Sequence, residues 1–390
     1  MSELLNQVVS SKQSCLSLFE YIDQHFSEFI DHLIRICEIP APTFSEQRRA
    51  QLISSLFAAS GFSPQQDQAG NVRVPILQNG KPHVVVSAHL DTVFSFEEIR
   101  VRKNGALLHA PGISDDSAGL SALLLLASVF KEIPRAAGSL TMVATVGEEG
   151  LGNLRGSRFL FEPESEAHQP IDFFISLDGA DPERIITAGL ASKRLRIRFR
   201  GPGGHSWGDA GIVNPIHVAG EFLHRINQVT LTQTPKTTLN VGVIQGGTSI
   251  NAIPTYVSLD VDLRSESAPH LEALDRTLSD LLATTANHHE GISTEREILG
   301  ERPAGSIAIK HRMVRTIAAC NAEFGISTSF ESASTDSNIA FAAGIPALTL
   351  GVGGKSGKIH TPEEWYDPTG AERGLKRTAL LIFELLHGPS

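Results

Sequence analysis

The sequence has few cysteines, no long apolar run and no excess of basic residues. Its three cysteines, Cys15, Cys37 and Cys320, stand too far apart for a disulfide framework or a zinc ribbon. The longest apolar run, 120–130, is shorter than the roughly 20 residues that a membrane-spanning helix needs. Lysine and arginine number 33 against 43 for aspartate and glutamate, which gives a net charge of −10. This net negative charge argues against binding to nucleic acid or to an anionic membrane surface.

The first residues, MSELLNQVVSSKQ, lack a basic stretch followed by an apolar core. No secretory signal is therefore predicted, and we expect a cytoplasmic protein. The 390 residues exceed what one small domain uses, and the hydrophobic content of 41% is that of an ordinary globular protein. We expect more than one globular domain.

The apolar pattern predicts an α/β fold in the first part of the chain and again near its end. Strands are predicted at 71–77, 83–89, 140–146, 172–177 and 347–350, and helices at about 16–36, 46–59, 117–131, 307–324 and 370–386. The run HVVVSAH at 83–89 is continuously apolar, which is typical of a strand covered on both faces by helices. Strands that alternate with helices favour a mixed sheet sandwiched by helices.

A different pattern occupies 191–300. The segment KRLRIRFR (193–200) alternates basic and apolar residues, as a half-exposed antiparallel strand does. The elements predicted after it are helices at about 214–227 and 269–286, and strands at about 238–244, 255–264 and 293–299. This β-α-β-β-α-β order is typical of a ferredoxin-like α+β unit. We therefore predict one domain made of 1–190 and 301–390, with an inserted domain at 191–300.

Two motifs early in the chain combine histidine with aspartate. His89 and Asp91 lie two residues apart at the end of a predicted strand, so their side chains point to the same side. That arrangement suits a metal-bound imidazole oriented by a carboxylate, with a chance His-x-Asp pair as the alternative. Asp115 and Asp116 precede a helix, where one of them is enough to cap the N-terminus. Two adjacent carboxylates repel each other unless a cation lies nearby.

Further candidate ligands follow later strands. Glu148 and Glu149 come directly after LTMVATV, Asp178 follows DFFISL, and His360 closes the stretch GVGGKSGKIH. Successive motifs in the first half are separated by about one strand–helix–strand step. Because clefts form outside the carboxyl ends of strands in open α/β sheets, we predict that these side chains meet in a metal site.

Oxygen ligands with two histidines suit zinc, cobalt or manganese. Five ligands exceed what one tetrahedral zinc needs, so a bridging aspartate would give each of two ions three protein ligands and a shared water. Such a site lowers the pKa of the bridging water and polarises a carbonyl group. A glutamate that is not a ligand would then serve as a general base. The chemistry implied is hydrolysis of an amide or ester.

Together, His-x-Asp, Gly-x-x-Asp-Asp-x-x-Gly, Gly-Glu-Glu, Asp-Gly and a late histidine resemble the co-catalytic dizinc exopeptidases. This family of hydrolases includes peptidase T, carboxypeptidase G and the aminoacylases. GEEGLGNLRGS and NVGVIQGGTSINAIP look most like its tripeptidase branch. The resemblance covers nearly the whole chain and implies a phosphorylase/hydrolase-like catalytic domain with an inserted lid and dimerisation domain. It also implies a homodimeric zinc metallopeptidase acting on short peptides.

The resemblance also implies roles for individual residues. Asp91 would orient His89, and Glu148 would take the water proton and pass it to the leaving amine. The peptide bond between Asp115 and Asp116 would be cis. Two zinc ions per subunit would be bound, the first by His89, Asp115 and Asp178 and the second by Asp115, Glu149 and His360.

Three residues of the inserted domain match family positions that contact substrate. His205, in GPGGHSW, would reach the active site of the partner subunit and stabilise the oxyanion; the alternative is a turn histidine between glycines. Asn251 would contact substrate. Arg264 would receive a substrate carboxylate, which suits a planar guanidinium, or it is a solvated charge at a strand end.

Three functions stay open. The first is an aminopeptidase acting on short peptides, and the second is a carboxypeptidase, dipeptidase or N-acyl amino acid amidohydrolase on the same site. The third is a metal-binding or dimer-forming scaffold without catalysis, which the presence of Glu148 disfavours. Ser117, where many relatives have lysine, leaves the subfamily open. A phosphate loop at GVGGKSGK is excluded because Thr349 stands where that motif needs glycine.

Overall fold

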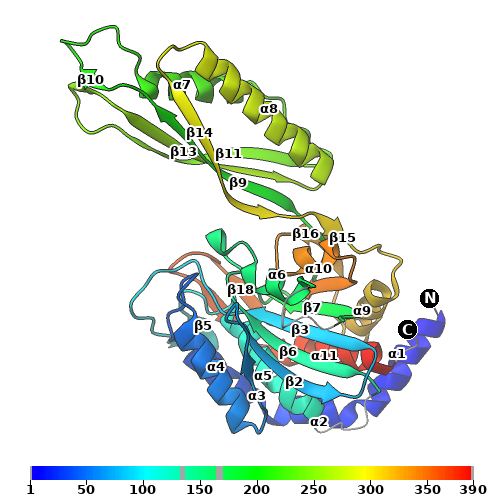
Figure 1. The fold of residues 1–390 in the computed structure, drawn as a ribbon. Coiled ribbons are helices and arrows are strands. Elements are labelled where there is room, and N and C mark those ends of the chain that lie inside the picture. Colours follow the sequence, from blue (N-terminus) through cyan, green and yellow to red (C-terminus); the bar gives the residue numbers. More distant parts are fainter. Residues whose placement is uncertain (1, 132–136, 164–169, 388–390) are drawn as a thin grey trace. The chain divides into compact units, whose positions relative to one another are not determined.

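The computed structural model describes residues 2–131, 137–163 and 170–387. The chain divides into two compact units, which are drawn in Figure 1. Unit 1 consists of 1–189 and 305–390, and unit 2 consists of 190–304. Among the described residues, no helix combines the length and apolar character needed to cross a membrane.

Unit 1 is built on a nine-stranded mixed sheet in the order β1-β2-β6-β3-β7-β17-β8-β15, with β16 paired to β8. Its strands are β1 (Gln65–Gln66), β2 (Val72–Gln78), β3 (His83–His89), β6 (Ser139–Thr145), β7 (Phe173–Leu177), β8 (Arg184–Gly189), β15 (Gly305–Ser306), β16 (Ser329–Ala333) and β17 (Ala347–Leu350). The four central strands β6, β3, β7 and β17 run parallel, so their carboxyl ends lie at one edge of the sheet. The chain goes from β3 to β6 on one side and then to β7 on the other, which makes β3 a topological switch point.

Helices cover both faces of this sheet. Figure 1 shows α5 (Ser117–Lys131) and α11 (Ala371–His387) on one face, with α6 (Arg155–Phe161) and α10 (Ser337–Ala342) on the other. Every residue of β3 is buried, as its continuous apolar run predicts. Helix α5 is buried along nearly its whole length because it packs against both the sheet and helix α3 (Phe26–Cys37). The predicted α/β class with a mixed sheet is confirmed.

The other helical segments of unit 1 are α1 (Ser2–Ser14), α2 (Leu16–Gln24), α4 (Gln47–Ala59), α9 (Arg312–Glu323) and the 3₁₀ turn η1 (Gly150–Gly152). The single helix predicted over 16–36 is wrong: α2 and α3 meet at His25, whose Nδ1 lies 2.9 Å from the carbonyl oxygen of Tyr21. The helix predicted from 307 begins at Arg312. His311 ends the preceding loop there, because its ring nitrogen accepts the N–H of Met313 as an N-cap.

A small second sheet in unit 1 was not predicted. It contains β4 (Arg102–Asn104), β5 (Leu107–His109), β18 (Lys355–Gly357) and β19 (Trp365–Asp367) in the order β18-β19-β5-β4. Strands of three residues are too short to give a clear alternating pattern. Their pairing brings 355–367, the segment that carries His360, beside the loop that follows β5.

Unit 2 is a four-stranded antiparallel sheet in the order β11-β13-β9-β14, with helices α7 and α8 packed on it. Its elements are β9 (Ala191–Arg200), α7 (Pro215–Ile226), β11 (Thr237–Gly246), β13 (Tyr256–Ser265), α8 (Ala268–Asn287) and β14 (Ser293–Arg302). This is the predicted β-α-β-β-α-β order with ferredoxin-like strand pairing. A ribbon of β10 (Gly204–His205) and β12 (Ala252–Ile253) lies at one tip of the unit (Figure 1).

Candidate metal centre

The predicted ligands of unit 1 come together at the carboxyl edge of the parallel strands. His89 is the last residue of β3, Glu149 follows β6, and Asp178 follows β7, whereas His360 lies in the loop between β18 and β19. Asp115 lies in the loop that enters α5, the helix leading from β3 towards β6. The edge of the sheet at the switch point is where open α/β folds form their clefts.

The carboxylate of Asp115 lies between two imidazoles. Its Oδ1 is 2.9 Å from Nε2 of His89, and its Oδ2 is 3.1 Å from Nε2 of His360. The same nitrogen of His360 is 2.8 Å from Oε1 of Glu149. Asp115 therefore has one oxygen directed to each histidine, as a bridging carboxylate must.

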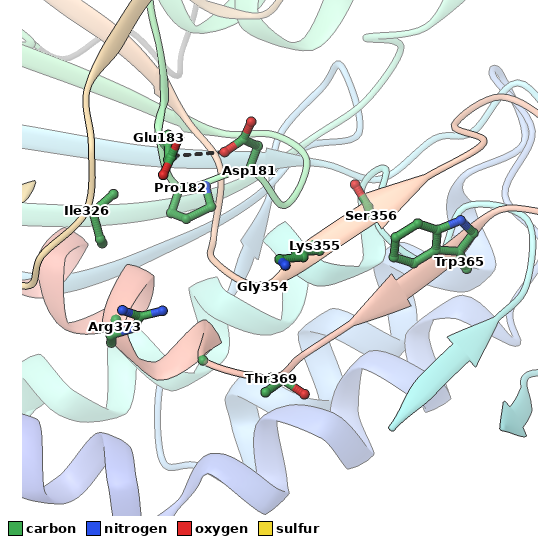
Figure 2. Close-up of a pocket in the computed structure, with 11 residues that line it drawn as sticks. Asp181, Pro182, Glu183, Ile326, Gly354, Lys355, Ser356, Trp365, Thr369 and Arg373 are labelled. Atoms are coloured by element: carbon green, nitrogen blue, oxygen red, sulfur yellow. Dashed lines mark hydrogen bonds between the residues drawn. The ribbon is translucent and has the colours of Figure 1, made fainter. Parts of the chain in front are cut away.

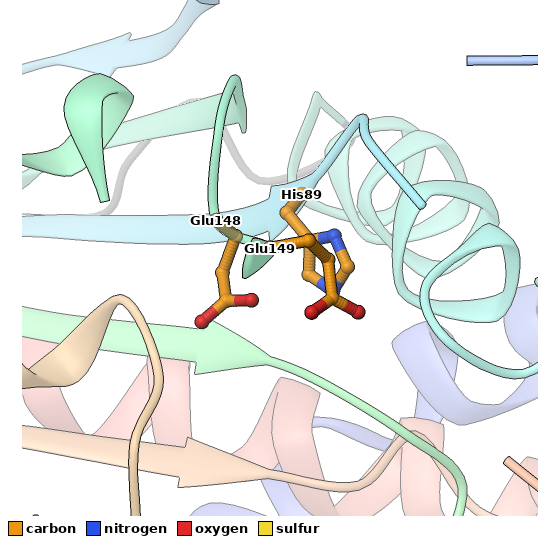
Figure 3. A group of neighbouring side chains, drawn as sticks. All are labelled: His89, Glu148 and Glu149. Carbon is orange, nitrogen blue, oxygen red and sulfur yellow. The ribbon is translucent and has the colours of Figure 1, made fainter. Parts of the chain in front are cut away.

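Three groups of side chains have ligand atoms that all lie within 4.8 Å of one another, and they are His89–Asp115–Asp178, Asp115–Glu149–His360 and His89–Glu148–Glu149. The first two groups share Asp115 and have the composition that the resemblance implies for two ions. Figure 3 shows the third, in which the carboxylates of Glu148 and Glu149 lie beside the ring of His89. Glu148 thus stands next to both metal groups without belonging to either.

Asp91 lies beside His89, but its carboxylate does not contact the ring of His89 as expected. It contacts the backbone that follows β6. Nδ1 of His89 is 2.9 Å from the main-chain oxygen of Asp91 and 3.8 Å from its nearest carboxylate oxygen. The carboxylate accepts the backbone N–H groups of Glu148 and Glu149, both at 2.9 Å, and the hydroxyl of Thr43 at 2.8 Å. Asp91 therefore orients the imidazole through its carbonyl group and holds the two glutamates through its side chain.

Asp115 and Asp116 have separate roles, and the peptide bond between them is cis. Asp116 is fully buried, and its Oδ1 accepts the N–H of Gly119 in the first turn of α5 at 3.1 Å. Its Oδ2 accepts the N–H of His89 at 3.0 Å. Asp116 is thus the helix cap that one of the two carboxylates was expected to provide, whereas Asp115 faces the histidines.

The electrostatics of the cluster favour a bound cation. Burial, reinforced by the charge of Asp115, raises the pKa of Asp178 to about 7. The hydrogen bonds that His360 donates to Asp115 and Glu149 raise the pKa of that imidazole to about 10. Burial opposes the charging of His89, yet the neighbouring carboxylates raise its pKa well above the usual value. Among the described residues, the carboxylates outnumber the basic groups beside them, and a divalent ion would balance this excess.

The donor atoms also fit such an ion. Both groups that share Asp115 combine one imidazole nitrogen with carboxylate oxygens, and neither contains a thiolate. Zinc, cobalt and manganese accept this mixture of ligands. With three side chains in each group, an open coordination position would remain for water or substrate.

A model of peptidase family M20/M25/M40 matches residues 85–384, which is most of the chain and includes unit 2. The chain belongs to this family. The family is one of metallopeptidases that bind divalent metals. The resemblance drawn from the motifs is confirmed.

Individual relatives agree with this assignment. The peptidase is 28% identical over 284 residues to the cytosol non-specific dipeptidase of Escherichia coli; the match covers 65% of this chain but only 56% of the dipeptidase. Its fold is similar to that of aminopeptidase PepT from Bacillus cereus (TM-score 0.73, 20% identity, 92% of this chain and 98% of that one). It is also similar to a tripeptidase from Staphylococcus aureus (TM-score 0.72, 24% identity, 92% and 96%). The likeness to these two structures supports the fold.

Two buried residues that were not predicted from the sequence form hydrogen bonds with the backbone next to the candidate ligands. Arg49 of α4 is fully buried and donates to the carbonyl oxygens of Ile39 and Leu90 at 2.7–3.0 Å, which fixes the chain between His89 and Asp91. Glu364 is fully buried as well and accepts hydrogen bonds from the loop that carries Asp115. An arginine on an amphipathic helix and a glutamate in a loop give no sequence signal of burial.

The three candidate residues of unit 2 lie in two places. His205 and Asn251 are neighbours on the ribbon, where His205 pairs with Ala252 and the carbonyl of Asn251 accepts the N–H of Ser206. Arg264 lies near the end of β13, opposite Ser192, and its Nε donates to Asp262 at 2.7 Å.

Unit 1 has two adjoining cavities, and the smaller one is lined in part by a candidate metal ligand. A cavity of about 260 Å³ begins at Asp178 and is lined by Arg184, Thr349 and Ile359, among others. It shares Asp181 and Ser356 with a larger cavity of about 460 Å³. Figure 2 shows the larger cavity, with the basic side chains Lys355 and Arg373 and the ring of Trp365 around it. The smaller cavity therefore adjoins the candidate ligand Asp178.

Proposed function

We propose that this peptidase is a dizinc aminopeptidase of short peptides, of the tripeptidase type. The observation that carries the proposal is the shared carboxylate: Asp115 belongs to two metal-binding groups and directs one oxygen to each histidine. His89, Asp115 and Asp178 would hold one ion, and Asp115, Glu149 and His360 the other. When bound, the two ions would lower the pKa of a water and polarise the substrate carbonyl.

Glu148 is the proposed general base. Its side chain is buried, and its carboxylate stands beside His89 and Glu149 rather than in either group that shares Asp115. It would accept the proton of the attacking water and then deliver it to the amine that leaves. Asp91 supports this role because it holds the backbone N–H of Glu148 at 2.9 Å.

His205 has the geometry of a hydrogen-bond donor to an oxyanion. Its Nδ1 accepts the backbone N–H groups of Trp207 and Gly208, both at 3.2 Å. A nitrogen that accepts two N–H groups carries no proton, so in the neutral ring the proton is on Nε2. That nitrogen would be available to donate to the oxygen that becomes negatively charged during hydrolysis.

The candidate substrate-contact residues of unit 2 lie far apart, and a homodimer would explain why. Arg264 is eight residues from Tyr256 along β13, which separates them by about 26 Å at about 3.3 Å per residue. His205 and Asn251 lie beyond the Tyr256 end of that strand. If both ends contact substrate, they would serve the sites of different subunits. Trp207 and Ile250 near His205 are 87% and 104% exposed, which suits a homodimer interface in unit 2.

The relatives support a second candidate on the same site. The Escherichia coli relative is a cytosol non-specific dipeptidase, which favours dipeptides as substrates and a cytoplasmic location. Carboxypeptidase and N-acyl amino acid amidohydrolase activities would need the same two ions and the same base. These functions differ from the first in the end of the substrate that is anchored.

A substrate comparison tests the proposal. The protein loaded with zinc, cobalt or manganese would be assayed on a free tripeptide, the N-acetylated tripeptide, and a dipeptide of the same residues. The proposal expects the free tripeptide to be hydrolysed fastest from its amino end. Turnover of only the acetylated peptide would contradict an aminopeptidase, and preference for the dipeptide would favour the second candidate.

A further inference from the structure

Glu364 holds the backbone of the loop that carries Asp115. Its Oε1 accepts the N–H of Ser114 at 2.9 Å, the hydroxyl of Ser114 at 2.7 Å and the N–H of Asp115 at 3.1 Å. Its Oε2 accepts the N–H of Gly112 at 2.9 Å. All four donors come from 112–115, and the side chain that receives them is fully buried. Glu364 is therefore engaged with the backbone behind the metal groups rather than with a metal.

The position of Glu364 is itself fixed by strand pairing. Its main-chain oxygen accepts the N–H of Ala110 at 3.1 Å, and Trp365, the next residue, begins β19 and pairs with His109 of β5. The two loops that meet here are far apart in the sequence. The pairing of β19 with β5 thus places the carboxylate of Glu364 directly against 112–115.

The same segment also carries a candidate ligand. His360 lies four residues before Glu364 and contacts the carboxylates of Asp115 and Glu149. Lys358 and His360 have positive φ values of 55° and 63°, a left-handed conformation that is unfavourable for residues other than glycine. Contacts with neighbouring residues must stabilise the segment in this conformation. Glu364 is buried and provides such contacts through its hydrogen bonds to 112–115.

We propose that Glu364 is a positioning residue for the second metal group: it sets the distance between Asp115 and His360, and so the affinity for the ion that these two residues and Glu149 bind. This inference rests on the proposed dizinc function. Replacing a side chain that holds a metal ligand in place typically lowers the metal affinity about 10- to 100-fold. The alternative is that Glu364 only stabilises the fold.

Neighbouring residues provide matched variants. Glu364→Gln preserves shape but presents an NH₂ group where at least one of the four donors needs an acceptor, so a hydrogen bond is lost and two donors face each other. Glu363→Gln makes the same chemical change one residue earlier, on an exposed side chain. Ser114→Ala removes one of the four hydrogen bonds and keeps the bonds from the N–H groups.

The test is a titration of the metal-free proteins with zinc and with cobalt, together with the visible spectrum of bound cobalt. We expect Glu364→Gln to bind one of two ions at least about 10-fold more weakly and to alter the cobalt spectrum. Ser114→Ala should change both in the same direction but less, and Glu363→Gln should match the unchanged protein. Thermal unfolding of the metal-free proteins measures any separate effect on the fold.

Two results would overturn the positioning role. One is a Glu364→Gln protein that unfolds at a lower temperature but keeps the affinity and the cobalt spectrum of the unchanged protein. The other, decisive if Glu364→Gln does not fold, is a folded Ser114→Ala protein with unaltered affinity and spectrum. Because metal titration needs no turnover, an unchanged protein that binds two ions but hydrolyses no peptide would contradict the proposed function and leave the role of Glu364 measurable.

Discussion

The carboxylates at the strand ends of unit 1 are buried or half-buried and outnumber the basic groups described beside them, whereas those on the open face of the unit 2 sheet each lie beside an arginine. Arg196 holds Asp260 through two hydrogen bonds of 2.7 Å, and Arg200 donates to Glu295 at 2.8 Å. A further pair joins Arg198 to Glu297. These partners alternate along β9 with apolar residues that face the helices.

The difference shows that acidic residues serve two different purposes in this protein. A carboxylate paired with arginine on a partly exposed sheet needs no further partner, and it adds solubility and modest stability. Carboxylates gathered in a buried site without enough arginine or lysine repel one another, so the folded chain gains by binding a cation there. Acidic residues alone therefore do not indicate a metal site, but carboxylates that gather around histidines without arginine or lysine partners do.

Removal of metal should have the largest effect. A chelator is expected to abolish peptide hydrolysis, and added zinc, cobalt or manganese should restore it. Because the ions bind the folded chain, metal at 100 times its Kd should raise the free energy of unfolding by about 2.7 kcal/mol for each ion bound. Activity and thermal unfolding would be followed in the same samples. Hydrolysis that persists after the metal content has fallen to zero would contradict the assignment of the unit 1 cluster.

Glu148→Gln should have the next largest effect. Without a group to accept the water proton, kcat should fall by about 10²- to 10⁴-fold, while both ions stay bound. Kinetics and metal analysis of the same preparation measure this. Glu149→Gln is the control, because the loss of a candidate ligand should lower the metal content as well. Full activity of Glu148→Gln with two bound ions would remove this residue from its proposed role.

His205→Ala is expected to lower kcat by about 10²-fold, in the range found for the loss of one oxyanion donor, without changing metal content. Mixing this variant with Glu148→Gln tests whether a partner subunit supplies the histidine. A mixed dimer would contain one site with both Glu148 and the histidine of the partner, so some activity should return. If mixing restores nothing although subunits exchange, the shared site is wrong.

The sequence alone predicts the candidate metal ligands better than it predicts the residues that hold those ligands in place. His89, Asp115, Glu149, Asp178 and His360 were predicted to meet because they follow strands or enter a helix, and the ends of parallel strands meet at one edge. Bounds were also predictable for β3 and α5, whose apolar patterns are long and strong. These predictions need only local pattern and topology.

The supporting contacts depend on details that no local pattern carries. The carboxylate of Asp91 holds the N–H groups of Glu148 and Glu149 instead of the ring of His89, which is decided by the path of the turn after β6. Glu364 reaches Asp115 only because β19 pairs with β5, two strands of three residues each. Arg49 follows Arg48 in the sequence, and only the packing of α4 buries one and not the other.

The smallest effects are expected on the open face of unit 2, where Arg196→Gln is the sharpest test. The hydrogen bonds from Arg196 lower the pKa of Asp260 below its usual value. Their stabilising effect should thus be present above the unfolded-state pKa of aspartate and be lost as the pH falls through the lowered value. Arg196→Gln should flatten this pH dependence of unfolding, measured by denaturant titration, while kcat/KM stays within about twofold and the metal content does not change. A loss of bound metal in this variant would mean that the two acidic regions are not independent, and that the pairing of carboxylates with arginine in unit 2 supports the site in unit 1.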